Sequence, residues 1–324
     1  MNNLKTYQLS VLRMCVLHSR AGESKFTESE YRTTKAGFAG EEKVIQFLAE
    51  ARLSKETRIF RNVLIDGTQI DIVVVNPRFV CILEVKNMTG ELFFSVHNKQ
   101  FYRLNGEGKK EGMRNPELQL QRAVKVLQRR LHSKEVDVRV RGIIVLASRS
   151  GIVVEAPHLF PVIPIDALTD LLEKMESSSR ELFNREDLKI MRKLMKGNTM
   201  KVEDSQLFER LNLDGRKLRC GVRCTECFHI GMVRTYSTWL CYRCGYRDKD
   251  AHLATLQEYQ LLFGREISSK ELKWWLGIED RFLCLRILNH SHESYQFGPK
   301  NRVYILKFEP YRLERFLASE MRKR

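Results

Sequence analysis

Three ionisable side chains, Asp71, Glu84 and Lys86, interrupt a stretch that is otherwise rich in Val and Ile. Carboxylates are the ligands that Mg²⁺ and Mn²⁺ prefer, and a pair of them can hold such a cation against a phosphate. Opposed Asp and Glu side chains repel each other unless a cation or a shared proton relieves the repulsion. We therefore expect Asp71 and Glu84 to hold Mg²⁺ or Mn²⁺, with Lys86 orienting or helping to deprotonate a water.

A strand hairpin must bring these residues together. Two apolar runs, residues 63–75 and 79–86, are separated by an Asn-Pro-Arg turn signal and predict two paired strands. If the loop has two residues, Asn76 pairs with Phe79, and the residue numbers of every further pair also sum to 155. Strand alternation then places four polar side chains on one face, namely Gln69, Asp71, Glu84 and Lys86.

Two predicted helices carry further candidates. Residues 34–50 have apolar side chains at steps of three and four, and Glu41 lies within that stripe. Asn115 followed by Pro116 is an N-cap signal for a helix that runs to about residue 131 and carries Gln119. Gln119 is either a site residue or an amide at the edge of the core that bonds to the backbone.

In this order the residues resemble the D…ExK core of the PD-(D/E)XK nuclease superfamily. The resemblance extends to the nuclease-related domain, NERD, and covers roughly residues 35–150. The matching motifs are Gly37-Phe38-Ala39-Gly40-Glu41, Asp71, Glu84-Val85-Lys86-Asn87 with Gly90, and Asn115-Pro116 with Gln119.

This resemblance implies an α/β fold with a mixed sheet flanked by helices. It implies a metal held by Asp71 and Glu84, a catalytic Lys86, and supporting catalytic roles for Glu41 and Gln119. The implied activity is metal-dependent hydrolysis of phosphodiester bonds in DNA. RNA as the substrate, and a non-catalytic regulatory protein that binds DNA with a nuclease-like fold, are alternatives. The number of carboxylates does not decide between one and two catalytic ions.

The charge of the chain favours nucleic acid as the partner. The 324 residues carry a formal net charge of +16, which attracts polyanions. Residues 96–150 hold thirteen Lys and Arg against five acids. Arg122, Lys125 and Arg129 share one predicted helix face and could follow a phosphate backbone, or they could simply be solvated.

Four cysteines predict a second metal site. Cys224 and Cys227, and Cys241 and Cys244, form two Cys-x-x-Cys pairs with 13 residues between them, a pattern typical of a zinc ribbon. Four thiolates close the coordination shell, so this Zn²⁺ would be structural. Cys220 and His229 are substitute ligands of lower rank. Basic residues around the ribbon could contact phosphates: Arg223, Arg234, Arg243 and Arg247.

Residues 251–324 predict a winged-helix-like α+β unit. A helix ends at Gly264, a second begins at Ser268-Ser269 with Glu271, and a third covers about residues 280–288. Two strands follow, joined by a Gly-Pro turn at residues 298–301 that would form the wing tip. We expect this unit and the ribbon to assist in binding nucleic acid.

The chain is expected to have five segments: residues 1–34, 35–170, 171–215, 216–250 and 251–324. These are an N-terminal extension, the nuclease-like domain, a helical linker, the zinc ribbon and the winged-helix-like domain. Hydrophobic residues make up 43% and charged residues 30%, as in ordinary globular proteins. No apolar run is long enough to span a membrane, and Arg13 interrupts the only candidate leader. The sequence therefore predicts a cytoplasmic protein.

Overall fold

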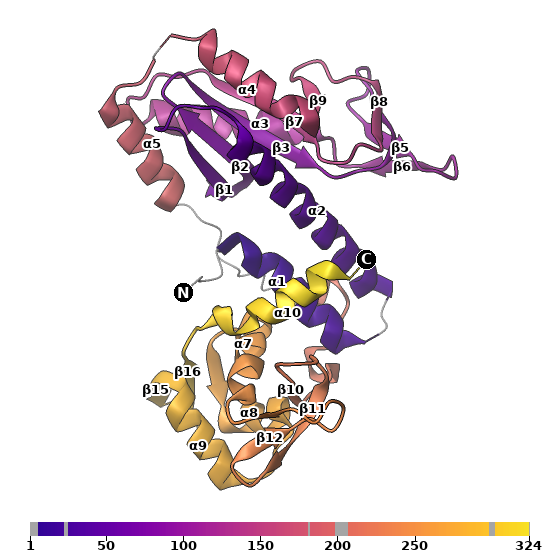
Figure 1. The fold of residues 1–324 in the computed structure, drawn as a ribbon, viewed down its shortest axis with the longest axis vertical. Coiled ribbons are helices and arrows are strands. Elements are labelled where there is room, and N and C mark those ends of the chain that lie inside the picture. The colour runs from indigo at the N-terminus through magenta and orange to yellow at the C-terminus, as the bar shows by residue number, and fades with distance from the viewer. Residues whose placement is uncertain (1–5, 23–24, 181, 198–206, 298–301, 324) are drawn as a thin grey trace. The chain divides into compact units, whose positions relative to one another are not determined.

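The computed structural model describes all residues except 1–5, 23–24, 181, 198–206, 298–301 and 324 (Figure 1). The chain divides into two compact units. The central unit comprises residues 36–200, and the terminal unit comprises residues 1–35 and 201–324. The finer boundaries at residues 170, 215 and 250 stay a proposal. No helix in the described ranges is long and apolar enough to cross a membrane.

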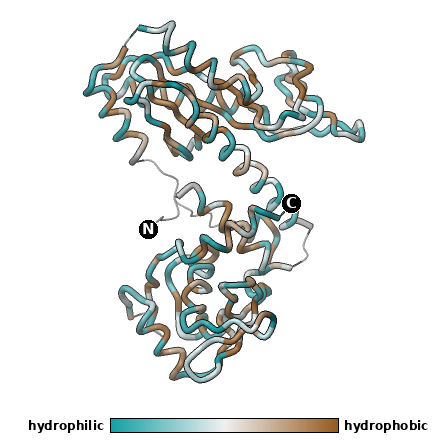
Figure 2. Tube along the Cα trace, viewed as in Figure 1, coloured by the Kyte–Doolittle hydropathy of each residue, from teal (hydrophilic) through white to brown (hydrophobic). Residues whose placement is uncertain are grey.

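A five-stranded mixed sheet forms the core of the central unit, in the order β1-β2-β3-β7-β9. Antiparallel pairing joins β1 to β2 and β2 to β3, whereas β3, β7 and β9 run parallel. Both faces are covered, which explains why the strands are nearly continuous runs of Val, Ile and Leu (Figure 2). The strands are β1 (Arg58–Ile65), β2 (Thr68–Asn76), β3 (Phe79–Lys86), β7 (Val140–Leu146) and β9 (Val162–Pro164).

Helices pack on both faces of this sheet. On one face, α2 (Lys25–Glu50) and α4 (Leu168–Ser177) cover a core cluster that includes Val44 and Leu172. On the other face, α3 (Pro116–His132) and α5 (Arg185–Gly197) cover a second cluster. The mixed sheet flanked by helices that the sequence predicts is therefore confirmed.

The predicted hairpin register is also confirmed, but only for part of its length. The pairs run from Asn76↔Phe79 to Ile72↔Leu83 and all sum to 155. Beyond Leu83 the ladder stops, and the expected opposition of Gln69 and Lys86 is wrong. Gln69 pairs with Leu64 of β1 instead, and its amide donates to the Asn62 side chain at 2.6 Å.

A smaller sheet extends the central unit, in the order β6-β5-β4-β8. Their bounds are β4 (Gly90–Phe94), β5 (Phe101–Leu104), β6 (Lys110–Met113) and β8 (Gly151–Glu155). A short 3₁₀ helix, η1 (Ile165–Ala167), precedes α4.

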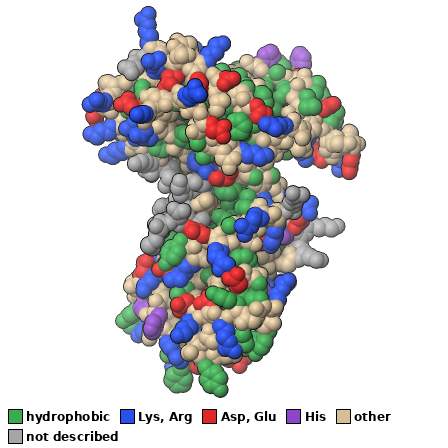
Figure 3. Space-filling view, viewed as in Figure 1, with side chains coloured by type: hydrophobic (Ala, Val, Ile, Leu, Met, Phe, Trp, Pro, Cys, Tyr) green, Lys and Arg blue, Asp and Glu red, His purple; other side chains and the backbone are tan. Residues whose placement is uncertain are grey.

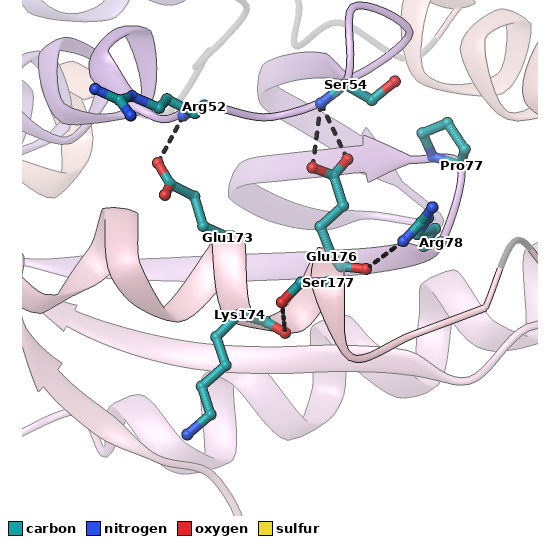
Figure 4. Close-up of a pocket in the computed structure, with 8 residues that line it drawn as sticks. All are labelled: Arg52, Ser54, Pro77, Arg78, Glu173, Lys174, Glu176 and Ser177. Carbon is teal, nitrogen blue, oxygen red and sulfur yellow. Dashed lines mark hydrogen bonds between the residues drawn. The ribbon is translucent and has the colours of Figure 1, made fainter.

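Acidic side chains of α4 anchor the loop that leads from α2 into β1 (Figure 4). Glu173 accepts the backbone N–H of Arg52 at 2.7 Å, and Glu176 accepts that of Ser54 at 3.0 Å. Glu176 also accepts the amide of Asn76 at the end of β2. The polar pocket in Figure 4 thus holds carboxylates that already serve the fold.

The terminal unit contains a small sheet of β10, β11, β12 and β13, in that order. Thr235 pairs with Thr238, which closes a tight hairpin between the two cysteine pairs. The bounds are β10 (Val222–Arg223), β11 (Ile230–Thr235), β12 (Thr238–Leu240) and β13 (Arg247–Asp248). Three short helices lie outside this sheet: α6 (Leu207–Arg210), η2 (Gly215–Lys217) and η3 (Pro310–Leu313).

The rest of the terminal unit has the winged-helix order of elements. A three-stranded sheet runs β14-β16-β15, and Ser268 and Glu271 form a capping box at the start of the second helix. The predicted wing-tip turn at residues 298–301 lies outside the described residues. The elements are α7 (Ala251–Phe263), β14 (Glu266–Ser268), α8 (Ser269–Leu276), α9 (Arg281–Ser291), β15 (His292–Phe297) and β16 (Arg302–Leu306).

A buried ion-pair triad joins three parts of the terminal unit. Glu258 of α7 pairs with Arg20 of α1 (Thr6–Ala21) at 2.5 Å and with Arg223, which precedes the first zinc-ribbon cysteine. Both arginines also stack on aromatic rings, one on Trp275 and the other on Phe316 of α10 (Glu314–Arg322). Arg223 is therefore buried and engaged by Glu258, and the expectation that it contacts phosphate is wrong.

Candidate functional site

Asp71 lies at a break in the sheet. The β2–β3 ladder ends at Ile72↔Leu83. Beyond it, the side chain of Asp71 accepts the N–H of Val85 at 3.0 Å. On the other side, the β1–β2 register places Asn62 opposite Asp71, and Asn62 has a φ of 48°. The carboxylate thus lies where neither neighbouring strand pairs regularly.

Glu84 and Lys86 are two residues apart on β3, so both side chains lie on the α3 side of the sheet. Glu84 is 6% exposed, and its Oε1 lies 2.7 Å from the Nζ of Lys86. The same Nζ donates to Oε1 of Gln119 on α3 at 3.0 Å. Asp71 is close enough to affect the pKa of Glu84. The structure therefore brings together the residues expected from the hairpin, except Gln69.

The start of α3 is fixed by the predicted cap. The side chain of Asn115 accepts the N–H of Glu117 at 2.9 Å, and Pro116 occupies the first turn. Glu117 is buried and accepts the N–H of Leu159, so it serves the fold. One turn into α3, Gln119 contacts Lys86, which favours its role as a site residue over the core-edge alternative.

Helix α2 brings Glu41 to the same place. Gly40 allows close packing, because a Cβ on it would lie 2.7 Å from the Cβ of Asn87. The Asn87 amide donates to the carbonyl of Ala36 at 2.8 Å and so ties the end of β3 to α2. Glu41 faces Arg61 of β1 at 3.5 Å, and Arg61 also pairs with Glu42 at 2.6 Å.

Arg61 lies beside the candidate site and is not among the residues predicted from the sequence. Its signal is a charged side chain within a largely apolar run, and the side chain is 9% exposed. Two acids of α2 lie against it, Glu41 and Glu42. Only the packing of α2 beside β1 shows that this cation faces Glu41, since the two residues are 20 positions apart.

Burial raises the pKa of all three carboxyls. The pKa of Glu84 rises to about 7 because the side chain is buried and Asp71 is near, while Lys86 opposes the rise. The pKa of Glu41 also rises to about 7, first from burial and then from the charge of Asp71, with Arg61 opposing. Burial raises the pKa of Asp71 too, against the charge of Lys86. Burial therefore disfavours the charged form of all three carboxyls.

This donor set fits a hard divalent cation. Asp71 and Glu84 offer carboxylate oxygens, and added positive charge would stabilise the charged form of Glu84, which burial and then the nearby Asp71 disfavour. Among the described residues, only the cysteine cluster has three or more candidate ligands all within 4.8 Å of one another. A cation at the carboxylates would thus use few protein ligands plus water and substrate oxygens, as Mg²⁺ commonly does.

The four cysteines converge as predicted. Their Sγ atoms all lie within 4.8 Å of one another, so this cluster could hold a Zn²⁺ ion. In each pair, the first cysteine donates its N–H to the carbonyl five residues later and accepts from the N–H four residues later, with N···O distances of 2.8 to 3.0 Å. The residue four positions on has a left-handed conformation, with φ of 59° at Phe228 and 75° at Gly245. Cys220 and His229 are not part of the cluster.

The basic candidates are accessible. Arg122, Lys125 and Arg129 are exposed on one side of α3, and Arg243 is exposed in the second cysteine turn. On the face drawn in Figure 3, Lys and Arg side chains are spread over both units instead of forming one patch. The overall charge alone therefore does not define a path for nucleic acid.

The sheet, its flanking helices and the polar cluster define the central unit as a nuclease-like α/β domain. Residues 36–147 match the family model NERD, the nuclease-related domain. The matched segment contains every residue of the carboxylate cluster and ends well before the four clustered cysteines. Comparisons with the curated proteins and with solved structures gave no match.

Proposed function

We propose that this protein is a metal-dependent nuclease that hydrolyses phosphodiester bonds in DNA. The observation that carries the proposal is the convergence of Asp71 and Glu84 at a break in the sheet, with the Lys86 ammonium 2.7 Å from Glu84. A nuclease-related domain covering these residues supports it. The proposed cutting site lies in the central unit.

Each residue has a proposed role. Mg²⁺ or Mn²⁺ held by Asp71 and Glu84 would, when bound, neutralise phosphate charge and increase the acidity of the attacking water. Lys86 stabilises negative charge that develops on the scissile phosphate. Gln119 positions Lys86 by accepting a 3.0 Å hydrogen bond from the Lys86 ammonium group. Glu41, with a pKa of about 7, can take up or release a proton near neutral pH.

The terminal unit is proposed to assist in binding. Four thiolates would complete the shell of a structural Zn²⁺, so that metal would maintain the fold and take no part in hydrolysis. Arg243 projects from the second cysteine turn and can contact a phosphate. On α9, Arg281 and Arg286 are exposed, which supports a role of the winged-helix-like elements in holding DNA.

The proposal is tested by incubating the pure protein with plasmid, linear and branched DNA and with RNA. Each substrate is tested with Mg²⁺, with Mn²⁺ and with EDTA, beside Lys86→Ala and Asp71→Asn. Lys43→Ala is the matched control because Lys43 is exposed on α2. We expect DNA cutting that requires a divalent ion, persists in the control and is lost in both site variants while DNA binding remains.

Two results would contradict the proposal. Cutting that survives both Lys86→Ala and Asp71→Asn would place the activity elsewhere or in a contaminant. DNA binding that no divalent ion affects, without cutting of any substrate, would support the non-catalytic regulatory alternative. Cutting confined to RNA would keep the nuclease chemistry but change the substrate class.

A further inference from the structure

A second recess lies on the α3 side of the central sheet, away from the carboxylate cluster. It has a volume of about 280 Å³ and lies between α3 and the turn that joins β1 to β2. Its polar lining includes six side chains: Asp66, Thr68, Gln121, Arg122, Lys125 and Arg129. It is therefore a defined concave site and more than a row of exposed cations.

The recess has a surplus of positive charge. Arg122, Lys125 and Arg129 are all exposed and follow one another at helical spacing. Asp66 is the one acid in the lining, and its carboxylate is engaged by Arg130 at 3.5 Å. Three cations thus face a space whose single acid already has a cationic neighbour, which suits an anion.

Thr68 adds a hydrogen-bond donor that needs a partner. The residue is 7% exposed, and in the described part of the chain its hydroxyl has no hydrogen-bond partner. Buried hydroxyls in folded proteins are almost always hydrogen-bonded, so this hydroxyl is available to donate to a group bound in the recess. Rotation about χ1 between staggered positions can direct this hydroxyl toward an anion.

The recess and the carboxylate cluster share their supporting elements. Thr68 precedes Asp71 by three residues on β2, which corresponds to about 10 Å along a strand. Gln119 precedes Arg122 by three residues on α3, about 5 Å along the helix. One DNA strand advances about 3.4 Å per nucleotide along the duplex axis, so these spacings correspond to a few nucleotides.

From these observations we propose that the recess binds a backbone phosphate of the DNA strand, a few nucleotides from the bond at the carboxylate cluster. Thr68 donates a hydrogen bond to that phosphate, and Arg122, Lys125 and Arg129 neutralise it. The contact reads no bases, so it places the strand without selecting a sequence. This proposal rests on the proposed function in one respect, that DNA is the ligand.

The test measures DNA binding in EDTA, where no metal-dependent cutting interferes. A labelled duplex of about 30 base pairs is titrated at several KCl concentrations, and affinity is plotted against salt. We expect Thr68→Val to weaken binding roughly three- to tenfold with an unchanged salt slope, because it removes a donor and no charge. Thr68→Ser keeps the hydroxyl and should bind like the wild type.

Charge removal should have a different signature. Replacing Arg122, Lys125 and Arg129 by Gln together should lower the salt slope by about 0.9 for each phosphate that the protein no longer neutralises. The matched control replaces three exposed lysines outside the recess by Gln: Lys43 on α2, Lys174 on α4, and Lys55 in the loop between α2 and β1. That control should change affinity and slope much less, since it removes the same charge from residues that do not line the recess.

The outcomes separate this proposal from the nuclease proposal. If Thr68→Val binds as the wild type does, or if both triple variants lose the same affinity and slope, the recess is not a phosphate site. Absence of DNA binding at low salt would also overturn it. If the variants behave as expected but the wild type cuts nothing, the recess stands and the nuclease proposal fails. Circular dichroism confirms that each variant is folded.

Discussion

Gly40 of α2 lies against Asn87 at the end of β3, so closely that a Cβ on the glycine would fall 2.7 Å from the Asn87 Cβ and 3.4 Å from that of Ala147. This contact sets how near α2 comes to the strand that carries Glu84 and Lys86. Glu41 is the next residue along α2, so the same contact fixes the position of its carboxyl. The second glycine of the Gly-x-x-Gly-Glu segment, Gly40, thus allows α2 to pack closely against the end of β3.

Gly40→Ala should reduce cutting at least tenfold, because the added methyl group forces α2 away from Asn87 and displaces Glu41. We expect a loss of about 1–3 kcal/mol in the free energy of unfolding from the same overpacking. Gly37→Ala is the control, since a Cβ there meets no atom within 4 Å. It should leave cutting unchanged and stabilise α2 by up to about 1 kcal/mol. Equal effects of both substitutions on cutting would contradict this explanation.

The raised pKa of Glu84, about 7, makes stability depend on pH when no cation is bound. A carboxyl with a folded-state pKa above its unfolded value of about 4.5 favours the folded state while protonated, and this contribution is lost as pH rises through 7. In EDTA, urea unfolding should therefore show lower stability at pH 8 than at pH 5.5. Glu84→Gln cannot titrate at this position, so it should remove about 1–3 kcal/mol of that difference.

Mg²⁺ provides a check on the same linkage. A cation that binds the deprotonated carboxylates should raise the stability of the wild type at pH 8 more than at pH 5.5. Glu84→Gln should respond less, because it lacks one of the two proposed ligands. A wild type whose stability is the same with EDTA and with Mg²⁺ at pH 8 would count against cation binding at this cluster.

Cys241→Ser should release about one zinc per chain, because it removes one of the four converging thiols. Zinc content is measured by mass spectrometry of the metal after dialysis. We expect weaker retention of DNA, while metal-dependent cutting by the central unit persists. Cys220→Ser is the matched control, since Cys220 lies outside the cluster and donates to the carbonyl of Leu218. Zinc loss from the control, or none from Cys241→Ser, would contradict the assignment.

Glu258→Gln should strongly destabilise the terminal unit. It leaves Arg20 and Arg223 buried without their shared carboxylate, and breaking a buried ion pair typically costs about 3–5 kcal/mol. Arg315→Gln breaks the exposed pair with Glu226 and should cost about 1 kcal/mol or less. Thermal unfolding of the two variants compares them directly. Similar melting temperatures would show that the triad contributes little.

The sequence by itself determined the local elements and several pairings. A two-residue loop after Asn76 fixed the hairpin register, because the loop length determines which residues face each other across the turn. Asn115 with Pro116 fixed the start of α3, and the Cys-x-x-Cys spacing fixed the thiol cluster. These features depend on near neighbours in the chain, where residue type and spacing restrict the backbone directly.

Tertiary packing decided the rest. The break in the ladder after Leu83, which separates Gln69 from Lys86, depends on pairing with β1 and on the side chain of Asp71. The pairing of Arg61 with Glu41 requires α2 to pack beside β1. Burial of Arg223 requires α1 and α7, which are far away in the sequence. Charge and polarity are visible in a sequence, but whether a charge meets solvent, a counter-ion or a ligand depends on which distant segments pack around it.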